Sequence, residues 1–144
     1  MNPATTGDTI VSELTIAATP ERIFDALVIP EQRMAWWGAG GPFKTEGVES
    51  DTRVGGAFSM RGNTGGRSWV VTGEYTEVDR PRALGFTWSP SFAPSAAATH
   101  VRFELIPQES GTLVRVTHSG LSPEAMSTHS GWPNILSQLR DFVS

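Results

Sequence analysis

The chain contains no cysteine among its 144 residues, which excludes both a disulfide framework and a thiolate metal site. It has no run of lysine or arginine, and its formal net charge is −4 at pH 7. Without a basic stripe to neutralise phosphates, we expect no nucleic-acid partner. No apolar stretch approaches the roughly 20 residues that a membrane-spanning helix needs, so we also expect no membrane insertion.

The first eight residues have neither the basic segment nor the apolar segment of a secretory signal, so we interpret the protein as cytoplasmic. They are polar, contain Pro3 and Gly7 and show no periodicity, which predicts a flexible tail over residues 1–8. The remaining length fits one domain with its own core, over residues 9–144. Nothing in the pattern decides the oligomeric state, and a homodimer stays open.

Most of the chain carries the sequence patterns of short β-strands. Residues 10–16 alternate between apolar and polar side chains, as in a half-buried strand. Further strands are predicted over residues 43–48, 56–61, 68–78, 83–88, 99–106 and 112–119. The joints between successive strands are short and rich in turn formers, for example residues 63–66 and 108–111. Short joints indicate antiparallel neighbours.

Two short helices are expected between the first and second of these strands. Thr19 is a capping residue, Pro20 has the φ angle that the first helical position needs, and Glu21 suits the positive end of the helix dipole. Pro30 ends this helix and begins a second one, which runs to Trp37.

The C-terminal segment predicts a long amphipathic helix that begins near residue 122. Its apolar residues recur at three- and four-residue spacing, which gives one broad stripe: Trp132, Ile135, Leu136, Leu139, Phe142 and Val143. Gly131 and Pro133 interrupt the pattern, so we expect a kink or break between Ser130 and Trp132.

A set of motifs in fixed order resembles START-like SRPBCC proteins, in particular the subfamily named after activators of the heat-shock chaperone ATPase. The matching segments are residues 18–27, 30–31, 36–38, 54–58, 73–78, 81–88, 111–112, 118–121 and 131–132, with Leu136 and Leu139. The resemblance implies an α+β helix-grip fold. In that fold a strongly curved antiparallel sheet of six or seven strands holds a long C-terminal helix, with two short helices after the first strand.

Proteins of this superfamily bind lipids, polyketides, hormones and other apolar molecules between the sheet and the C-terminal helix. The resemblance therefore implies a small hydrophobic molecule as partner, bound without a cofactor. Strand alternation and helix position predict which side chains would face that space. The candidate ligand-binding residues are Trp36, Trp37, Phe58, Met60, Tyr75, Phe86, Trp88, Phe103, His118, Met126, Trp132 and Ile135. An alternative interpretation is that these side chains form only core.

The sequence offers few candidate catalytic or metal-binding residues. The three histidines lie on separate elements without metal-ligand spacing, so we expect no metal site, and no residue is assigned a catalytic role. His118 points inward by strand phase and would orient a ligand or act as a general base, whereas a structural hydrogen bond explains it equally well. His100, Arg102 and Glu104 are predicted to face outward.

Three functions follow from these observations. A binding protein for a hydrophobic ligand is favoured over a cyclase- or hydratase-type enzyme and over a co-chaperone-like ATPase activator. The enzyme needs two titratable groups within reach of one another in the interior, such as His118 with Glu74 or Tyr75. An apolar interior with one polar anchor would instead indicate binding.

Overall fold

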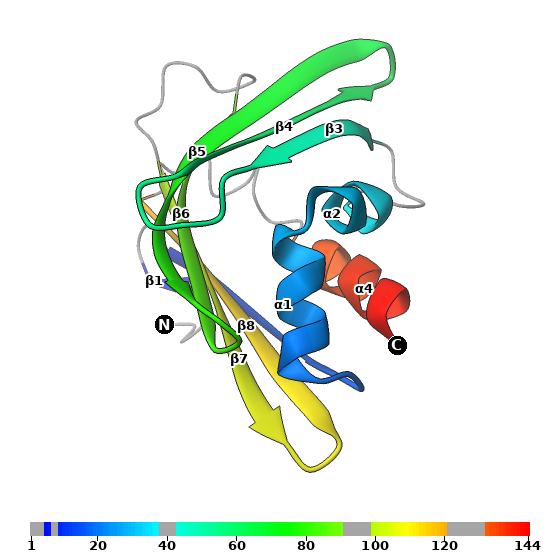
Figure 1. Ribbon diagram of the computed structural model, residues 1–144. Helices are drawn as coiled ribbons and strands as arrows, with labels where there is room; N and C mark the ends of the chain where they lie inside the picture. Colours follow the sequence, from blue (N-terminus) through cyan, green and yellow to red (C-terminus); the bar gives the residue numbers. More distant parts are fainter. Residues whose placement is uncertain (1–4, 7–8, 38–42, 91–98, 121–131) are drawn as a thin grey trace.

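One antiparallel sheet forms the body of the protein, and all described helices lie on its concave side (Figure 1). The computed structural model describes residues 5–6, 9–37, 43–90, 99–120 and 132–144. The strands are β1 (Thr5–Thr6), β2 (Thr9–Ile16), β3 (Phe43–Ser50), β4 (Ala57–Thr64), β5 (Arg67–Asp79), β6 (Ala83–Pro90), β7 (Thr99–Gln108) and β8 (Gly111–Ser119). Their order across the sheet is β1-β2-β8-β7-β6-β5-β4-β3.

The sheet order confirms the curved antiparallel sheet of the helix-grip fold. From β3 to β8 each strand pairs with the next in sequence, as the short joints indicated. The first long strand, β2, crosses to the far side of the sheet and pairs with β8. Among the described residues, seven strands have eight residues or more. The eighth, β1, is a two-residue pairing with β2 inside the segment expected to be a tail.

The two short helices begin where the sequence predicted. Helix α1 (Pro20–Val28) has Thr19 as its N-cap, and the Thr19 hydroxyl accepts a hydrogen bond of 3.1 Å from the Arg22 amide. The chain becomes extended at Ile29, and Pro30 opens α2 (Pro30–Trp36). The indole of Trp36 donates to the carbonyl of Ala26 across 2.8 Å, which fixes α2 against α1.

The C-terminal helix α4 (Trp132–Val143) carries the predicted apolar stripe. Its buried residues are Trp132, Ile135, Leu136, Leu139 and Val143. Its backbone approaches β2, α1 and α2 (Figure 1). The earlier part of the predicted helix, with the expected kink, lies outside the described residues. None of the described helices is both long and apolar enough to cross a membrane.

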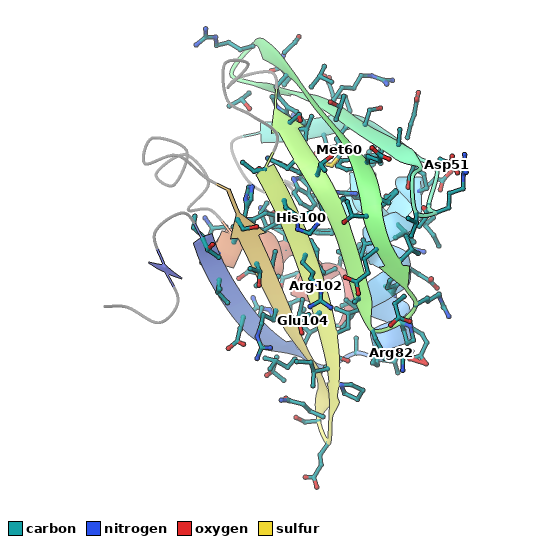
Figure 2. The ribbon with its side chains drawn as sticks, turned by 90° about the vertical axis from the view of Figure 1, so that its left-hand side faces the viewer. Asp51, Met60, Arg82, His100, Arg102 and Glu104 are labelled. Atoms are coloured by element: carbon teal, nitrogen blue, oxygen red, sulfur yellow. The ribbon has the colours of Figure 1, made fainter. Side chains whose placement is uncertain are left out.

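Strand alternation predicted the two faces of the sheet correctly. On β7, Val101, Phe103 and Leu105 are buried between outward-facing neighbours. Figure 2 views the convex face, where the side chains of His100, Arg102 and Glu104 stand along that strand. The same alternation buries Val114, Val116 and His118 on β8.

Ion pairs cross the convex face of the sheet and connect four strands. Arg115 on β8 pairs with Glu13 on β2 and with Glu104 on β7. Arg102 on β7 pairs with Glu104 and reaches over β6 to Glu77 on β5, at 2.8 Å. Arg102 and Glu77 can meet across β6 because Gly85, the β6 residue between them, has no side chain.

Candidate functional site

Large aromatic side chains meet on the concave face of the sheet, in front of the start of α4. We call the following group the aromatic cluster: Trp37, Trp88, Trp132, Phe58, Phe86 and Phe103. Trp37 is the C-cap of α2, Trp88 comes from β6 and Trp132 is the first residue of α4. The ring centroids of Trp37 lie 5.9 Å from those of Trp88 and of Trp132, and the latter two are 6.3 Å apart. Three elements distant in sequence therefore converge at one apolar centre.

The phenylalanines extend this centre along the sheet. The rings of Phe86 and Phe58 meet edge to face at 5.0 Å, and those of Phe86 and Phe103 stack at 6.2 Å. Phe103 also meets Trp132 edge to face at 5.9 Å. Such geometries are favourable for aromatic pairs beyond the area that they bury. Phenylalanine and tryptophan rings thus line the region between α4 and the central strands.

His118 borders the aromatic cluster and is fully buried. Its Nδ1 lies 3.2 Å from Nε1 of Trp132, and its Nε2 lies 2.7 Å from Oγ1 of Thr99. An indole N–H can only donate, so Nδ1 must accept and the imidazole proton must reside on Nε2. The Nε2–H then donates to Thr99, whose hydroxyl donates to the carbonyl of Trp88. Both ring nitrogens are occupied by protein groups, which leaves no free lone pair for a general base.

Tyr75 supplies a second polar group on the concave face. Its ring is buried against Phe58, while its hydroxyl lies 2.6 Å from Oγ of Ser50. The Ser50 hydroxyl in turn lies 2.8 Å from that of Thr52. Glu74, its neighbour on β5, is exposed, so of these two residues Tyr75 is the one that faces the interior.

Arg33 is the most unusual side chain of the interior, because it is charged and only 1% exposed. It extends from α2 to the aromatic cluster, where its guanidinium carbon lies over three ring centroids. The distances are 4.8 Å to Trp37, 5.1 Å to Phe58 and 5.4 Å to Phe86. Within the described part of the chain, none of its three side-chain nitrogens has a hydrogen-bond partner.

The energetics of Arg33 are unfavourable without a further partner. Burying an ion costs several kcal/mol even after relaxation, whereas a desolvated cation–π contact returns about 2 kcal/mol. Aromatic faces also leave the N–H donors unfilled, and each buried unfilled donor costs about 1–3 kcal/mol. Burial lowers the pKa of Arg33 below its ordinary value. The nearby Tyr75 hydroxyl opposes this shift, although no guanidinium nitrogen reaches hydrogen-bond geometry with it.

Most of the predicted site residues are buried on the concave side. Those that the structure places there are Trp36, Trp37, Phe58, Met60, Tyr75, Phe86, Trp88, Phe103, His118, Trp132 and Ile135. Trp36 is set apart by its hydrogen bond to α1, and Met126 lies outside the described residues. Whether these side chains contact a ligand remains a prediction.

Arg33 was not among the predicted residues, because an arginine between Gln32 and Met34 resembles a surface position. The signal that could have found it is helical spacing. Arg33 precedes Trp36 and Trp37 by three and four residues, so it shares their inward face.

The buried polar side chains of the described residues are Arg33, Thr99, Thr112 and His118. No aspartate or glutamate among those residues belongs to this buried set. Nor do three or more acidic or histidine side chains gather there in a group that could hold a metal ion. In the part of the chain that the structure describes, the interior therefore offers donors and an apolar surface but no acid–base pair.

The comparisons with known proteins agree on the fold. The family model described as "Activator of Hsp90 ATPase homolog 1-like protein" matches residues 17–144. No curated protein matches the chain. The crystal structure of protein NE0264 from Nitrosomonas europaea has a TM-score of 0.82 at 19% identity, covering 99% of this chain and 97% of that one.

Two further solved structures are similar. Protein CV1439 from Chromobacterium violaceum has a TM-score of 0.81 at 23% identity, over 94% of this chain and 97% of that one. The AHSA1-like protein from Aeromonas hydrophila has a TM-score of 0.78 at 23% identity, over 94% of this chain and 91% of that one. At these identities the likeness shows the fold alone.

Proposed function

This chain belongs to the family of activator of Hsp90 ATPase homolog 1-like proteins, within the START-like superfamily, and we propose that it binds a small hydrophobic molecule between its sheet and α4. The observation that carries the proposal is the aromatic cluster, in which rings from α2, β6 and α4 converge on the concave face. The cytoplasmic location and the domain limits expected from the sequence are part of the same proposal.

Aromatic surface supports this function energetically. Enclosing a few hundred Å² of apolar ligand surface at about 25 cal/mol per Å² gives several kcal/mol of gross affinity, before the entropy of association is subtracted. Rings also give a ligand rigid walls at low conformational cost.

The polarity of the interior favours binding over catalysis. The enzyme interpretation required His118 to act with Glu74 or Tyr75. Glu74 is exposed, and both nitrogens of His118 are engaged by Thr99 and Trp132. The described interior therefore lacks the poised acid–base pair that a cyclase or hydratase needs.

The described surface gives a co-chaperone role no specific support. A protein-docking site usually shows a contiguous apolar patch. The large hydrophobic side chains exposed in the described residues are Met34, Val54 and Val70, which lie on α2, in the β3–β4 turn and on β5. They are single residues on separate elements.

The direct test is calorimetric titration of the purified protein with two neutral probes, 2-naphthamide and decanol, with tryptophan fluorescence as a second signal. We expect saturable binding of at least one probe with a negative heat-capacity change, since apolar surface leaves water. Native mass spectrometry of protein purified from its own host would identify a molecule that co-purifies. Absence of saturable binding, up to the limit of solubility, by these probes and by carboxylic acids with the same apolar groups would show that the proposal is wrong.

A further inference from the structure

Arg33 is a buried cation on the concave face. Among the residues that the structure describes, its guanidinium nitrogens have no hydrogen-bond partner, and the side chain is 1% exposed. Rings of Trp37, Phe58 and Phe86 surround it. These rings attract the positive charge, yet their faces contain no acceptor atom for the N–H groups. The rings therefore stabilise the charge of Arg33 but leave its N–H groups without acceptors.

A second donor lies beside this cation. The ring of Tyr75 lies 5.6 Å from that of Phe58 and 6.1 Å from that of Phe86, two rings that also face the Arg33 guanidinium. The Tyr75 hydroxyl lies 2.6 Å from Oγ of Ser50. The Ser50 hydroxyl has Thr52 as a further partner at 2.8 Å. Because hydroxyl protons rotate, Tyr75 can turn its proton toward an incoming acceptor while Ser50 donates to the phenol oxygen.

We propose that Arg33 anchors the ligand through a carboxylate, with the Tyr75 hydroxyl as the second donor and the aromatic cluster enclosing the apolar part of the ligand. This inference rests on the proposed function and names its ligand class: a monoanionic carboxylic acid with an apolar body. The planar guanidinium fork matches the two oxygens of a carboxylate.

The charge balance favours a carboxylate over a phosphate. Arg33 is the one buried cationic side chain in the part of the chain that the structure describes. A monoanion neutralises it, whereas a doubly charged phosphate would leave one negative charge buried among aromatic rings without a partner. The apolar body has two candidate sources, an aryl group or an alkyl chain, which the probes below distinguish.

The test compares acids with their neutral amides: 2-naphthoate with 2-naphthamide, and decanoate with decanamide, all at pH 7, where the acids are ionised. Wild-type protein is expected to bind at least one acid about tenfold or more tighter than its amide, the effect of one charge-assisted hydrogen bond. Preference in the naphthyl pair indicates an aryl acid, and preference in the decyl pair indicates an alkyl acid.

Variants attribute this preference to Arg33. Arg33→Met replaces the side chain with an unbranched apolar one and should remove the preference for the acid over its amide. Because Arg33→Met also removes an unpaired buried charge, we expect it to fold at least as stably as wild type. Arg82→Met, at a side chain that is 73% exposed, is the matched control for net charge and should retain the preference.

Two further variants keep the test decisive if Arg33→Met folds poorly. Arg33→Lys retains the charge without the planar fork and should reduce the preference only partly. Tyr75→Phe keeps the ring, removes the second donor and should also reduce it partly. A merely structural Arg33 would leave the acid-to-amide ratio unchanged in both variants.

The outcomes separate this inference from the proposed function. If wild type binds amides and acids equally, or if the preference survives in Arg33→Met, the carboxylate anchor is wrong and hydrophobic binding stands. If neither acids nor amides bind, both proposals are wrong. A preference that depends on Arg33 and is retained in Arg82→Met supports both.

Discussion

Trp132 donates its indole hydrogen to Nδ1 of His118 across 3.2 Å, in the buried interior. This bond ties the first residue of α4 to β8, and the opposite nitrogen of His118 continues the connection to Thr99 on β7. A predicted ligand-binding histidine thus holds the C-terminal helix at the edge of the aromatic cluster.

The first prediction concerns this tie. Trp132→Phe removes the donor and leaves Nδ1 of His118 buried without it, which should lower the free energy of unfolding by about 1–3 kcal/mol. In a double-mutant cycle with His118→Leu, the two losses should not add, because each variant breaks the same bond. Urea denaturation measures both. Trp69→Phe, at a half-buried tryptophan of β5, is the control. Additive losses would contradict the coupling.

The second prediction concerns ligand binding. Trp132→Ala should weaken binding of hydrophobic probes, because it deletes one wall of the aromatic cluster. His100→Ala should not, since His100 lies on the convex face and bonds there to Thr76 at 2.8 Å. Titration calorimetry on both variants measures the difference. As Trp132→Ala removes a buried indole at a cost of about 3–5 kcal/mol, Trp132→Leu serves as a milder variant. Equal affinities in all variants would place the binding site elsewhere.

A third prediction tests the start of α1. Thr19→Ala deletes the hydroxyl that accepts from the Arg22 amide, and should destabilise the protein by about 1 kcal/mol. Thr19→Ser keeps the acceptor and should stay close to wild type. Thermal and urea unfolding of the pair measure this. If the alanine and serine variants were equally stable, the cap would contribute nothing.

The fourth prediction is a pH dependence. The hydrogen bond from Arg102 lowers the pKa of Glu77 below its ordinary value. Glu77 therefore stabilises the folded state above the ordinary carboxylate pKa, and this contribution is lost as the pH falls through the lower folded-state value. Both side chains are more than a third exposed, so the effect is under about 1 kcal/mol.

The measurement for Glu77 is the stability difference between wild type and Glu77→Gln. The difference should favour wild type at pH 7 and shrink at pH 3. Glu109→Gln, at an exposed residue of the β7–β8 turn, is the control. A difference that grows on acidification would have the wrong sign.

The helices and strands could be predicted because each has a recognisable pattern in its own stretch of sequence. Thr19 and Pro20 mark a helix start by their own chemistry, and two-residue alternation on β7 reports which side is buried. The ordered motifs then specified how these elements assemble. Local patterns were sufficient wherever the burial of a side chain follows from its neighbours in sequence.

The site was predictable only in part, because its chemistry comes from contacts between distant elements. The sequence placed His118 inside but could not show that Trp132 occupies its Nδ1. It gave no reason to bury Arg33, since the rings that surround its guanidinium come mainly from β4 and β6. Tyr75 was chosen by its strand position, whereas its bond to Ser50 depends on the pairing of three strands.

The pairing of β2 with β8 has a consequence for synthesis. A ribosome completes the first long strand early and its partner about one hundred residues later, so this contact closes a very long loop. Until residues 111–119 emerge, the hairpins from β3 to β7 present an open edge at β7 that only the last strand can cover. A nascent or truncated chain that lacks β8 is therefore the form of this protein most exposed to aggregation.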